Sequence, residues 1–165
     1  RALVEFGLVP FPSRRYLLGL GNYPMGDDSI GLRSVEHIIH ENLDRDFRAI
    51  DLSAHAMNLL FYCTEETENI VIVDAVDMGI SPGEFRIFSP EDVDSFKPST
   101  GMTTHESDIL KVILMGKNLG YTIPPIQILG IQPETMTSVM ELSPLLQSRM
   151  KEYISTTLSA VIETE

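Results

Sequence analysis

The chain has 165 residues, 24 of them acidic and 12 basic, and therefore a formal net charge of −12. Its length fits one hydrophobic core, and its content of 43% hydrophobic and 22% charged residues excludes a disordered or fibrous protein. An acidic surface repels polyanions, so we expect no nucleic-acid partner. It favours a cation or a basic protein segment as a guest, although solubility alone also explains it.

The first 15 residues are expected to form an extended N-terminal arm, because two prolines, Pro10 and Pro12, disfavour a helix there. Residues 16–165 are then expected to form a single α/β domain. No apolar run approaches the roughly 20 residues of a membrane helix, and charges interrupt the apolar pieces at the start of the chain. The single cysteine, Cys63, allows no intrachain disulfide. We therefore expect a cytoplasmic protein that does not enter a membrane.

From Tyr16 onward, short β-like runs alternate with segments of helical period, which predicts an α/β sheet protein. The first half of this pattern gives a buried strand, an amphipathic helix, a second strand, a short helix and the most hydrophobic strand of the chain. In order, these elements cover residues 15–21, 29–43, 47–53, 56–66 and 69–77.

The second half begins with turn signals on both sides of Phe85–Phe88, which predict a short strand at or near the edge of the sheet. A helix that ends at a glycine follows over residues 106–120. Residues 123–133 predict a strand bounded by prolines. The last element is one long amphipathic helix over residues 143–162, with Ser143 as its N-cap and a proline at its first position.

The stretch LGLGNYPMGDDSIG, residues 18–31, combines four glycines with Asp27 and Asp28 at a strand-to-helix turn. Its first glycines resemble the dinucleotide-binding pattern G-x-G-x-x-G, but the third glycine is misplaced. The two carboxylates would also repel a pyrophosphate group. We therefore do not expect a nucleotide here. Considered alone, Asp28 is explained equally well as a helix N-cap.

Three groups of polar residues lie where open α/β sheets bind ligands, outside the carboxyl ends of the strands. They are Asp27 and Asp28 after the first strand, Asp74 and Asp77 at the end of the most hydrophobic strand, and His105 in the loop before the third helix. Two carboxylates and an imidazole at one edge would supply oxygen and nitrogen ligands for a divalent transition metal and leave positions open for a guest.

Each of these residues also has an ordinary explanation. Asp74 and Asp77 are suited to flank a turn, and His105 is suited to a solvated loop. The other three histidines lie on the first helix and in the loop after the second strand, and they are weaker candidates. Only the predicted convergence of distant residues on a single edge supports a functional site.

Four motifs resemble the endopeptidases that mature [NiFe]-hydrogenases. In chain order they are GLGNYPMGDDSIG, IVIVDAVDMGISPGEFRIFSPEDV, MTTHESDIL and ILGIQP. The resemblance runs from about Tyr16 to the end of the chain, and it is strongest to the branch serving formate-hydrogenlyase-type and related enzymes. It implies a three-layer α/β sandwich with a mostly parallel, twisted five-stranded sheet and helices on both faces. It also implies a cytoplasmic hydrolase, an endopeptidase of the aspartyl-like kind.

The same resemblance implies that the protein removes a short C-terminal extension from the hydrogenase large-subunit precursor after nickel insertion. It assigns the metal-recognition carboxylate to Asp28, the second carboxylate to Asp74 and the histidine to His105, as catalytic and metal-binding residues together. By this interpretation the protein has no intrinsic cofactor, and the nickel is presented by the substrate. Because thiolates of the precursor hold nickel, the two carboxylates and the imidazole would complete its coordination, and a precursor without nickel would bind poorly.

Several points stay open. The water that cleaves the peptide bond could be activated by either Asp28 or Asp74. A serine or cysteine nucleophile is disfavoured, because TTHES lacks a nucleophile elbow and Cys63 is expected inside a helix. A non-catalytic chaperone or accessory protein of the large subunit, and a metallohydrolase with its own metal, are the alternative functions.

Two departures from the family pattern concern the substrate path. Ser29 stands where the family usually has a glycine, and the loop after the second strand is DLSAHAM instead of a glycine-rich sequence. This loop is bulkier and less permissive at positive φ, so it could change the path of the substrate tail and bring His55 to the cleft.

Overall fold

The computed structural model of the protein describes residues 14–95 and 104–162, with the side chains of 93–95 and 104–107 left out. Most of the expected N-terminal arm lies outside the described residues. The first strand begins at Arg15, one residue earlier than the expected start of the domain.

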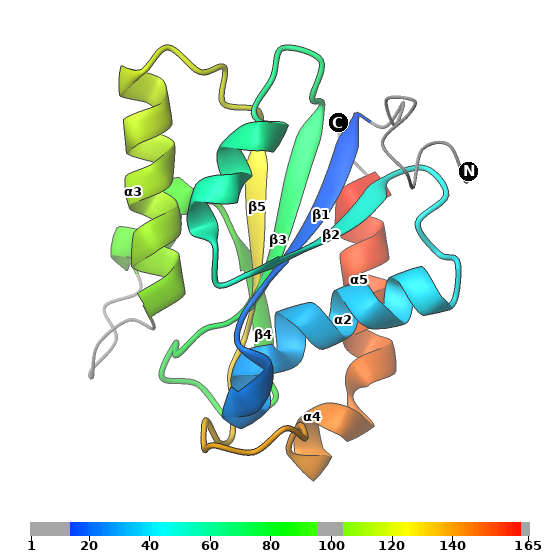
Figure 1. Cartoon of the computed structure of the whole chain (residues 1–165). Coiled ribbons are helices and arrows are strands. Elements are labelled where there is room, and N and C mark those ends of the chain that lie inside the picture. The colour runs from blue at the N-terminus through cyan, green and yellow to red at the C-terminus, as the bar shows by residue number, and fades with distance from the viewer. Residues whose placement is uncertain (1–13, 96–103, 163–165) are drawn as a thin grey trace.

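Five strands form a single sheet in the described part of the chain (Figure 1). In chain order they are β1 (Arg15–Leu20), β2 (Arg48–Ser53), β3 (Asn69–Ala75), β4 (Phe85–Phe88) and β5 (Ile126–Ile131). Their order in space is β2-β1-β3-β5-β4. Strands β2, β1, β3 and β5 are parallel to one another, whereas β4 pairs antiparallel with β5 at one edge of the sheet. This confirms the mostly parallel sheet and the edge position predicted for Phe85–Phe88.

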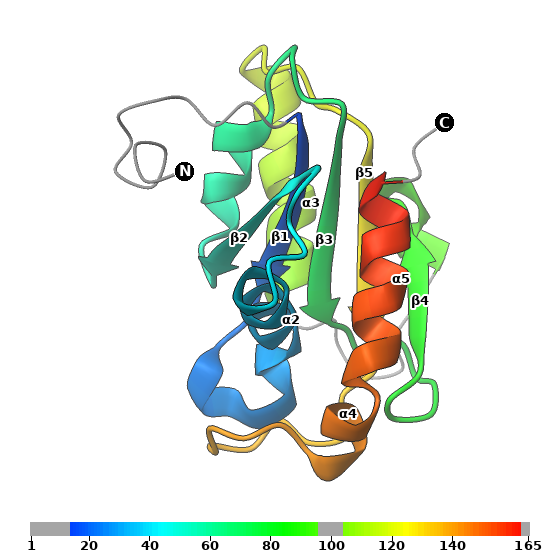
Figure 2. The ribbon, with the colours of Figure 1, turned by 90° about the vertical axis from the view of Figure 1, so that its right-hand side faces the viewer.

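Helices cover both faces of the sheet, which confirms the three-layer sandwich (Figure 2). The α-helices are α2 (Ile30–His40), α3 (Thr104–Asn118), α4 (Pro144–Ser148) and α5 (Met150–Ile162), and the 3₁₀ segments are η1 (Tyr23–Ser29), η2 (Ala56–Tyr62) and η3 (Pro90–Ser95). Helices α2 and α5 pack on one face, and η2 and α3 lie on the other. None of the helices in the described ranges is long and apolar enough to span a bilayer.

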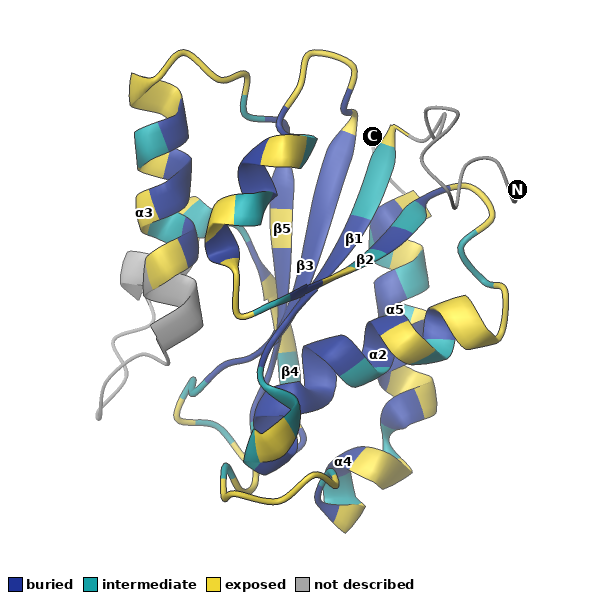
Figure 3. Ribbon diagram, in the orientation of Figure 1, coloured by how far each residue is buried: buried dark blue, intermediate teal, exposed yellow. Residues whose placement is uncertain are grey.

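The alternation of side chains along the strands divides the core between the two faces. In β3, Val71 and Val73 pack with α2 and α5, whereas Ile70 and Ile72 pack with η2 and α3. All seven residues of β3 are buried (Figure 3). A strand buried on both faces needs a continuous apolar run, which is why NIVIVDAVD is the most hydrophobic stretch of the chain.

Three predicted helices differ in detail. The segment over 56–66 is a 3₁₀ helix that ends at Tyr62, with hydrogen bonds of the i to i+3 kind. The long C-terminal helix is divided at Arg149, where the backbone N–H bonds to Leu146 three residues back and ends α4. Its predicted N-cap is confirmed, because the Ser143 hydroxyl accepts from the backbone N–H of Leu146 at 3.3 Å. Helix α3 begins at Thr104, so His105 belongs to its first turn and not to the preceding loop.

The ends of β1 and β3 meet the start of α2 at Gly31. A Cβ atom at this position would lie 2.2 Å from the carbonyl oxygen of Val73 and 2.5 Å from that of Leu20. Only glycine allows α2 to begin so close to the two strand ends. We call the edge of the sheet that contains the carboxyl ends of β1, β2, β3 and β5 the carboxyl edge. Helix α2 begins at this edge.

We expect Gly31→Ala to lower the free energy of unfolding by about 3 kcal/mol, because the clashing atoms belong to the backbone and cannot move aside. Gly79→Ala is the matched control, since Gly79 has open space around it and only its φ of +67° opposes a side chain. That variant should lose about 1 kcal/mol. Urea unfolding measures both, and equal losses would contradict the packing described.

Candidate active site

Asp27 binds the loop between β5 and α4 with both of its carboxylate oxygens. Oδ2 accepts from the backbone N–H groups of Glu134 at 2.9 Å and Thr135 at 3.1 Å, and Oδ1 accepts from that of Ser143 at 2.7 Å. The side chain is fully buried. Three charge-assisted hydrogen bonds compensate the desolvation of this carboxylate. The first aspartate of the pair is therefore structural, a role that the sequence did not distinguish.

Asp28 lies in the same turn and is 3% exposed. Its Oδ2 accepts from the side-chain amide of Asn22 at 3.0 Å. The turn brings the Asp28 backbone against Gly21, whose φ is +148° and where a Cβ atom would lie 2.0 Å from the Asp28 carbonyl oxygen. Gly21 and Asn22, which follow β1, thus fix the position of Asp28. The glycine leaves room for the Asp28 backbone, and the asparagine donates a hydrogen bond to the Asp28 side chain.

Asp74 is the penultimate residue of β3 and is 1% exposed. It lies in register with Gly130 of β5. Because Ile70 and Ile72 face η2 and α3, the alternation of the strand places Asp74 toward that same face. An acidic residue at the end of the most buried strand has no role in apolar packing, which supports a chemical role for it.

The structure brings Asp28 and Asp74 to the carboxyl edge. Their strands are neighbours, with Gly19 opposite Val73, and η1 packs against β3. The amino end of α3 lies toward the same end of the sheet (Figure 1). The side chain of His105 lies outside the described residues. The site of three residues therefore stays a prediction, and the structure places only two of them, Asp28 and Asp74, at the same edge. Among the side chains that the structure describes, no group of three or more His, Cys, Asp or Glu could hold a metal ion.

Asp77 has a structural role. Its Oδ1 accepts from the backbone N–H of Gly79 at 3.1 Å and from the side-chain amide of Gln132 at 3.2 Å. Gln132 in turn accepts from the backbone N–H of Met78 at 2.7 Å. These bonds fix the loop after β3 to the residue that follows β5, as the turn interpretation of Asp77 predicted.

A groove of about 420 Å³ lies between η2 and α3, beyond the end of β2. It is lined by Ala54, His55, Ala56, Met57, Asn58, Asp108, Lys111 and Val112. His55 is exposed in this groove, and Asp108 lies in the same helix as His105, three residues further on. Two residues before His55, the backbone of Ser53 is left-handed, with a φ of +50°. His55 therefore lines a groove next to the end of β2, and neither Asp28 nor Asp74 is among the residues that line this groove.

On the other side of β2, a groove of about 370 Å³ has an apolar floor that includes Leu32 and Val35. The Tyr23 hydroxyl donates to Glu36 at 3.2 Å there. Burial raises the pKa of Tyr23, and the negative charges of Glu36 and Asp51 raise it further. Arg33 lies over the Tyr23 ring and forms an ion pair with Glu36, so both signs of charge are present on this side.

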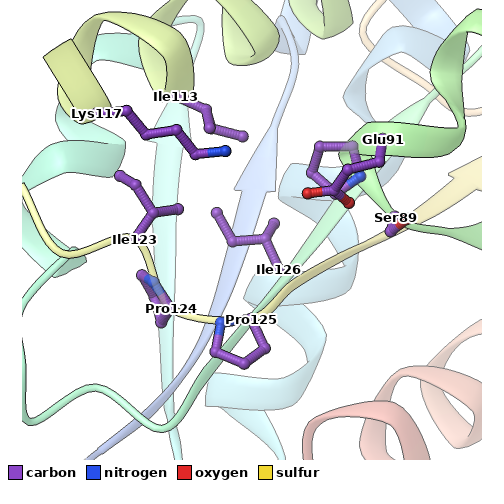
Figure 4. Close-up of a pocket in the computed structure, with 9 residues that line it drawn as sticks. Ser89, Glu91, Ile113, Lys117, Ile123, Pro124, Pro125 and Ile126 are labelled. Carbon is purple, nitrogen blue, oxygen red and sulfur yellow. The ribbon is translucent and has the colours of Figure 1, made fainter.

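Two other features are remote from the carboxyl edge. A pocket of about 400 Å³ lies at the amino end of β5, where Lys117 and Glu91 flank Ile113 and Ile126 (Figure 4). Cys63 follows η2 and is buried, and its thiol donates to the Leu59 carbonyl at 3.5 Å. Burial raises the pKa of this thiol to about 11. A cysteine nucleophile is disfavoured on these grounds, although Cys63 lies after the helix and not inside it.

The fold and the paired carboxylates at its carboxyl edge define an α/β protein with a candidate site for a cation. A family model described as hydrogenase maturation protease matches residues 32–160. The chain is 34% identical over 119 residues to the Hydrogenase 3 maturation protease of Escherichia coli strain K12, with 72% of each protein covered. The chain therefore belongs to the hydrogenase maturation protease family.

Two further similarities agree. The chain is 31% identical over 123 residues to the hydrogenase expression/formation protein HupD of Rhodobacter capsulatus. The aligned region covers 74% of this chain and 58% of that protein. The hydrogenase maturating endopeptidase HybD from E. coli shares the fold, with a TM-score of 0.75, 22% identity, and 89% and 91% of the two chains covered. The chain spans between 58% and 65% of the length of the first three HupD proteins that it matches.

We expect Asp27→Asn to lower the free energy of unfolding by about 3 kcal/mol, because the amide places an N–H group against backbone N–H donors in a buried site. The matched control is Asp51→Asn, an exposed aspartate whose Oδ1 accepts from the backbone and hydroxyl of Ser53. Exposure should limit its loss to less than about 1 kcal/mol. Thermal and urea unfolding measure both, and a tolerated Asp27→Asn would show that the three bonds contribute little.

Proposed function

We propose that the protein is an endopeptidase that removes a C-terminal extension from the nickel-loaded large-subunit precursor of a [NiFe]-hydrogenase. Membership of the hydrogenase maturation protease family supports the reaction class. The observation that carries the proposal for the site is the burial of Asp28 and Asp74 at one edge of the sheet. Buried carboxylates at one edge of a sheet supply oxygen ligands for a divalent cation that is presented there.

Nickel belongs to the substrate in this proposal and serves as its recognition element. Asp28, Asp74 and His105 would complete the coordination of an ion that thiolates of the precursor already hold. The hydrogen bond from Asn22 orients Asp28 before the substrate arrives, which lowers the cost of ordering this ligand. A precursor without nickel offers no cation to the buried carboxylates, so its affinity is lower.

Cleavage requires a water molecule that attacks the scissile carbonyl and a group that accepts its proton. Asp28 and Asp74 are both carboxylates at the carboxyl edge and are the two candidates for this base. Nickel of the substrate would polarise the carbonyl oxygen and stabilise the negative charge that develops there. The leaving amine of the tail then takes a proton, and the two peptide products separate.

The finer assignments are also proposals. We place the protein in the branch that serves formate-hydrogenlyase-type enzymes, with the large-subunit precursor as partner and the cytoplasm as the compartment. A reducing compartment suits the free thiol Cys63 and the thiolates that hold nickel in the precursor. Offering the protein nickel-loaded precursors from two branches would test the branch, because the correct precursor should be cleaved at least 10-fold faster.

We expect Asp28→Asn, Asp74→Asn and His105→Gln each to lower kcat/KM for the nickel-loaded precursor by at least about 100-fold, because each removes a ligand or base. Mass spectrometry of the released C-terminal peptide measures the rate. The matched control is Asp77→Asn, a carboxylate after the same strand whose partners are structural. It should keep activity within about 10-fold of the original protein.

Three results would contradict the proposal in different ways. Binding of the precursor without peptide release would show a chaperone or accessory protein. Stoichiometric metal in the purified protein would show a metallohydrolase with its own ion. Equal cleavage of nickel-loaded and nickel-free precursors would show that nickel is not the recognition element.

A further inference from the structure

Segment η1, which carries Asp28, is not a regular helix. The backbone of Pro24, Met25 and Gly26 departs from helical φ and ψ, and Gly26 has a φ of +59°. A residue in a regular helix is held by the hydrogen bonds of that helix, whereas an irregular turn depends on neighbouring segments for its shape. The position of Asp28 therefore depends on the segments that pack against η1.

The loop between β5 and α4 lies beside η1 (Figure 2), and we call its residues 134–143 the strap. The backbone N–H of Gly26 donates to the carbonyl of Val139 at 2.7 Å, and that of Asp27 donates to the carbonyl of Thr135 at 3.0 Å. A Cβ atom at Gly26 would lie 3.3 Å from two carbonyl oxygens of the strap. The carboxylate of Asp27 adds three bonds to the same loop. The strap therefore supports η1 along its length.

Arg33, in the first turn of α2, contacts η1 and the strap at the same time. Its Nη2 donates to the carbonyl of Met140 in the strap at 2.8 Å. Its guanidinium carbon lies 4.7 Å from the centre of the ring of Tyr23, the first residue of η1. Glu36 joins this group, because its Oε2 accepts from the Tyr23 hydroxyl at 3.2 Å and from Arg33 at 3.5 Å. A planar guanidinium can stack on a ring and donate in its own plane together, which the ammonium of a lysine cannot do.

Two charged side chains thus join η1 to the strap at different depths. Asp27 is fully buried and bonds to the strap in the interior, whereas the Arg33 side chain is 28% exposed and bonds to it near the surface. The two charges meet different partners, because Asp27 accepts from backbone N–H groups and Arg33 donates to a backbone carbonyl. Removing the Arg33 guanidinium would leave the interior connection in place and release the outer one.

We propose that Arg33 is a positioning residue for Asp28, an inference that rests on the proposed function. By binding Met140 and Tyr23 together, Arg33 holds the strap against η1. Segment η1 in turn holds Asp28 at the carboxyl edge in the orientation of a nickel ligand or base. This role differs from that of Asn22, which bonds to Asp28 directly. Loss of a supporting contact around a metal ligand typically lowers affinity or activity by about 10- to 100-fold.

Arg33→Met tests the inference on the full chain, because methionine keeps an unbranched stem and removes the guanidinium. We expect kcat/KM for the nickel-loaded precursor to fall at least about 10-fold. Arg33→Lys can still donate to Met140 and should recover activity to within about threefold of the original protein. Circular dichroism and urea unfolding check that each variant is folded at the assay temperature.

The matched control is Arg149→Met. Arg149 also pairs with two glutamates and lies over a tyrosine ring, but these partners belong to α5 and to the residue before β4. The control therefore loses the same kinds of contact at a distance from η1, and its kcat/KM should stay within about twofold of the original value. An equal loss of activity in both variants would overturn the inference.

Carbon-13 NMR of the aspartate carboxylates measures the environment of Asp28 without any substrate. The Asp28 signal is assigned by its absence from the spectrum of Asp28→Asn. We expect Arg33→Met to shift or broaden this signal and Arg149→Met to leave it unchanged. Unchanged kcat/KM in Arg33→Met, or lower activity with an unchanged Asp28 signal, would overturn the inference. Failure of the proposed function is distinct, since the original protein would then not cleave the precursor, and the NMR signal alone would decide whether Arg33 positions Asp28.

Discussion

The buried Asp27 carboxylate joins two loops that the rest of the carboxyl edge depends on. Its three hydrogen bonds reach residues 107 to 116 positions away in the chain, so one side chain fixes the turn after β1 to the loop after β5. The backbone strengthens this connection, because Asp27 N–H donates to Thr135 and Gly26 N–H donates to Val139. Asp28 is the next residue, and its position follows directly from that of Asp27.

The adjacent aspartates thus have separate tasks, one in structure and one in the proposed chemistry. The Asp27 carboxylate accepts hydrogen bonds from three backbone N–H groups, which fix its position in the fold. One carboxylate oxygen of Asp28 accepts from the side-chain amide of Asn22, which orients this side chain. A cation that reaches the carboxyl edge therefore meets a carboxylate that is already in place.

The fold was largely predictable from the sequence, because buried parallel strands need apolar runs that are easily seen, as in NIVIVDAVD. The division of the C-terminal helix at Arg149 was not, since the apolar period continues across it. The start of α3 at Thr104 was missed for a related reason, because no apolar residue between there and Ile109 marks a helical face. The structural role of Asp27 could not be predicted, since its partners lie more than 100 positions away, and only the family resemblance had selected Asp28 from the pair. The groove with His55 and Asp108 needs two elements that only the folded chain brings together.

Ser53 has the left-handed backbone that glycine adopts most easily, and Asp51 stabilises it by accepting from both its backbone N–H and its hydroxyl. In the unfolded chain a serine has fewer backbone conformations than a glycine. With Ser53 the loop before His55 therefore loses less conformational entropy on folding than it would with a glycine. A glycine at this position would adopt the same backbone conformation without a side-chain contact to Asp51. The loop before His55 can therefore exchange stiffness for freedom through a single substitution at position 53.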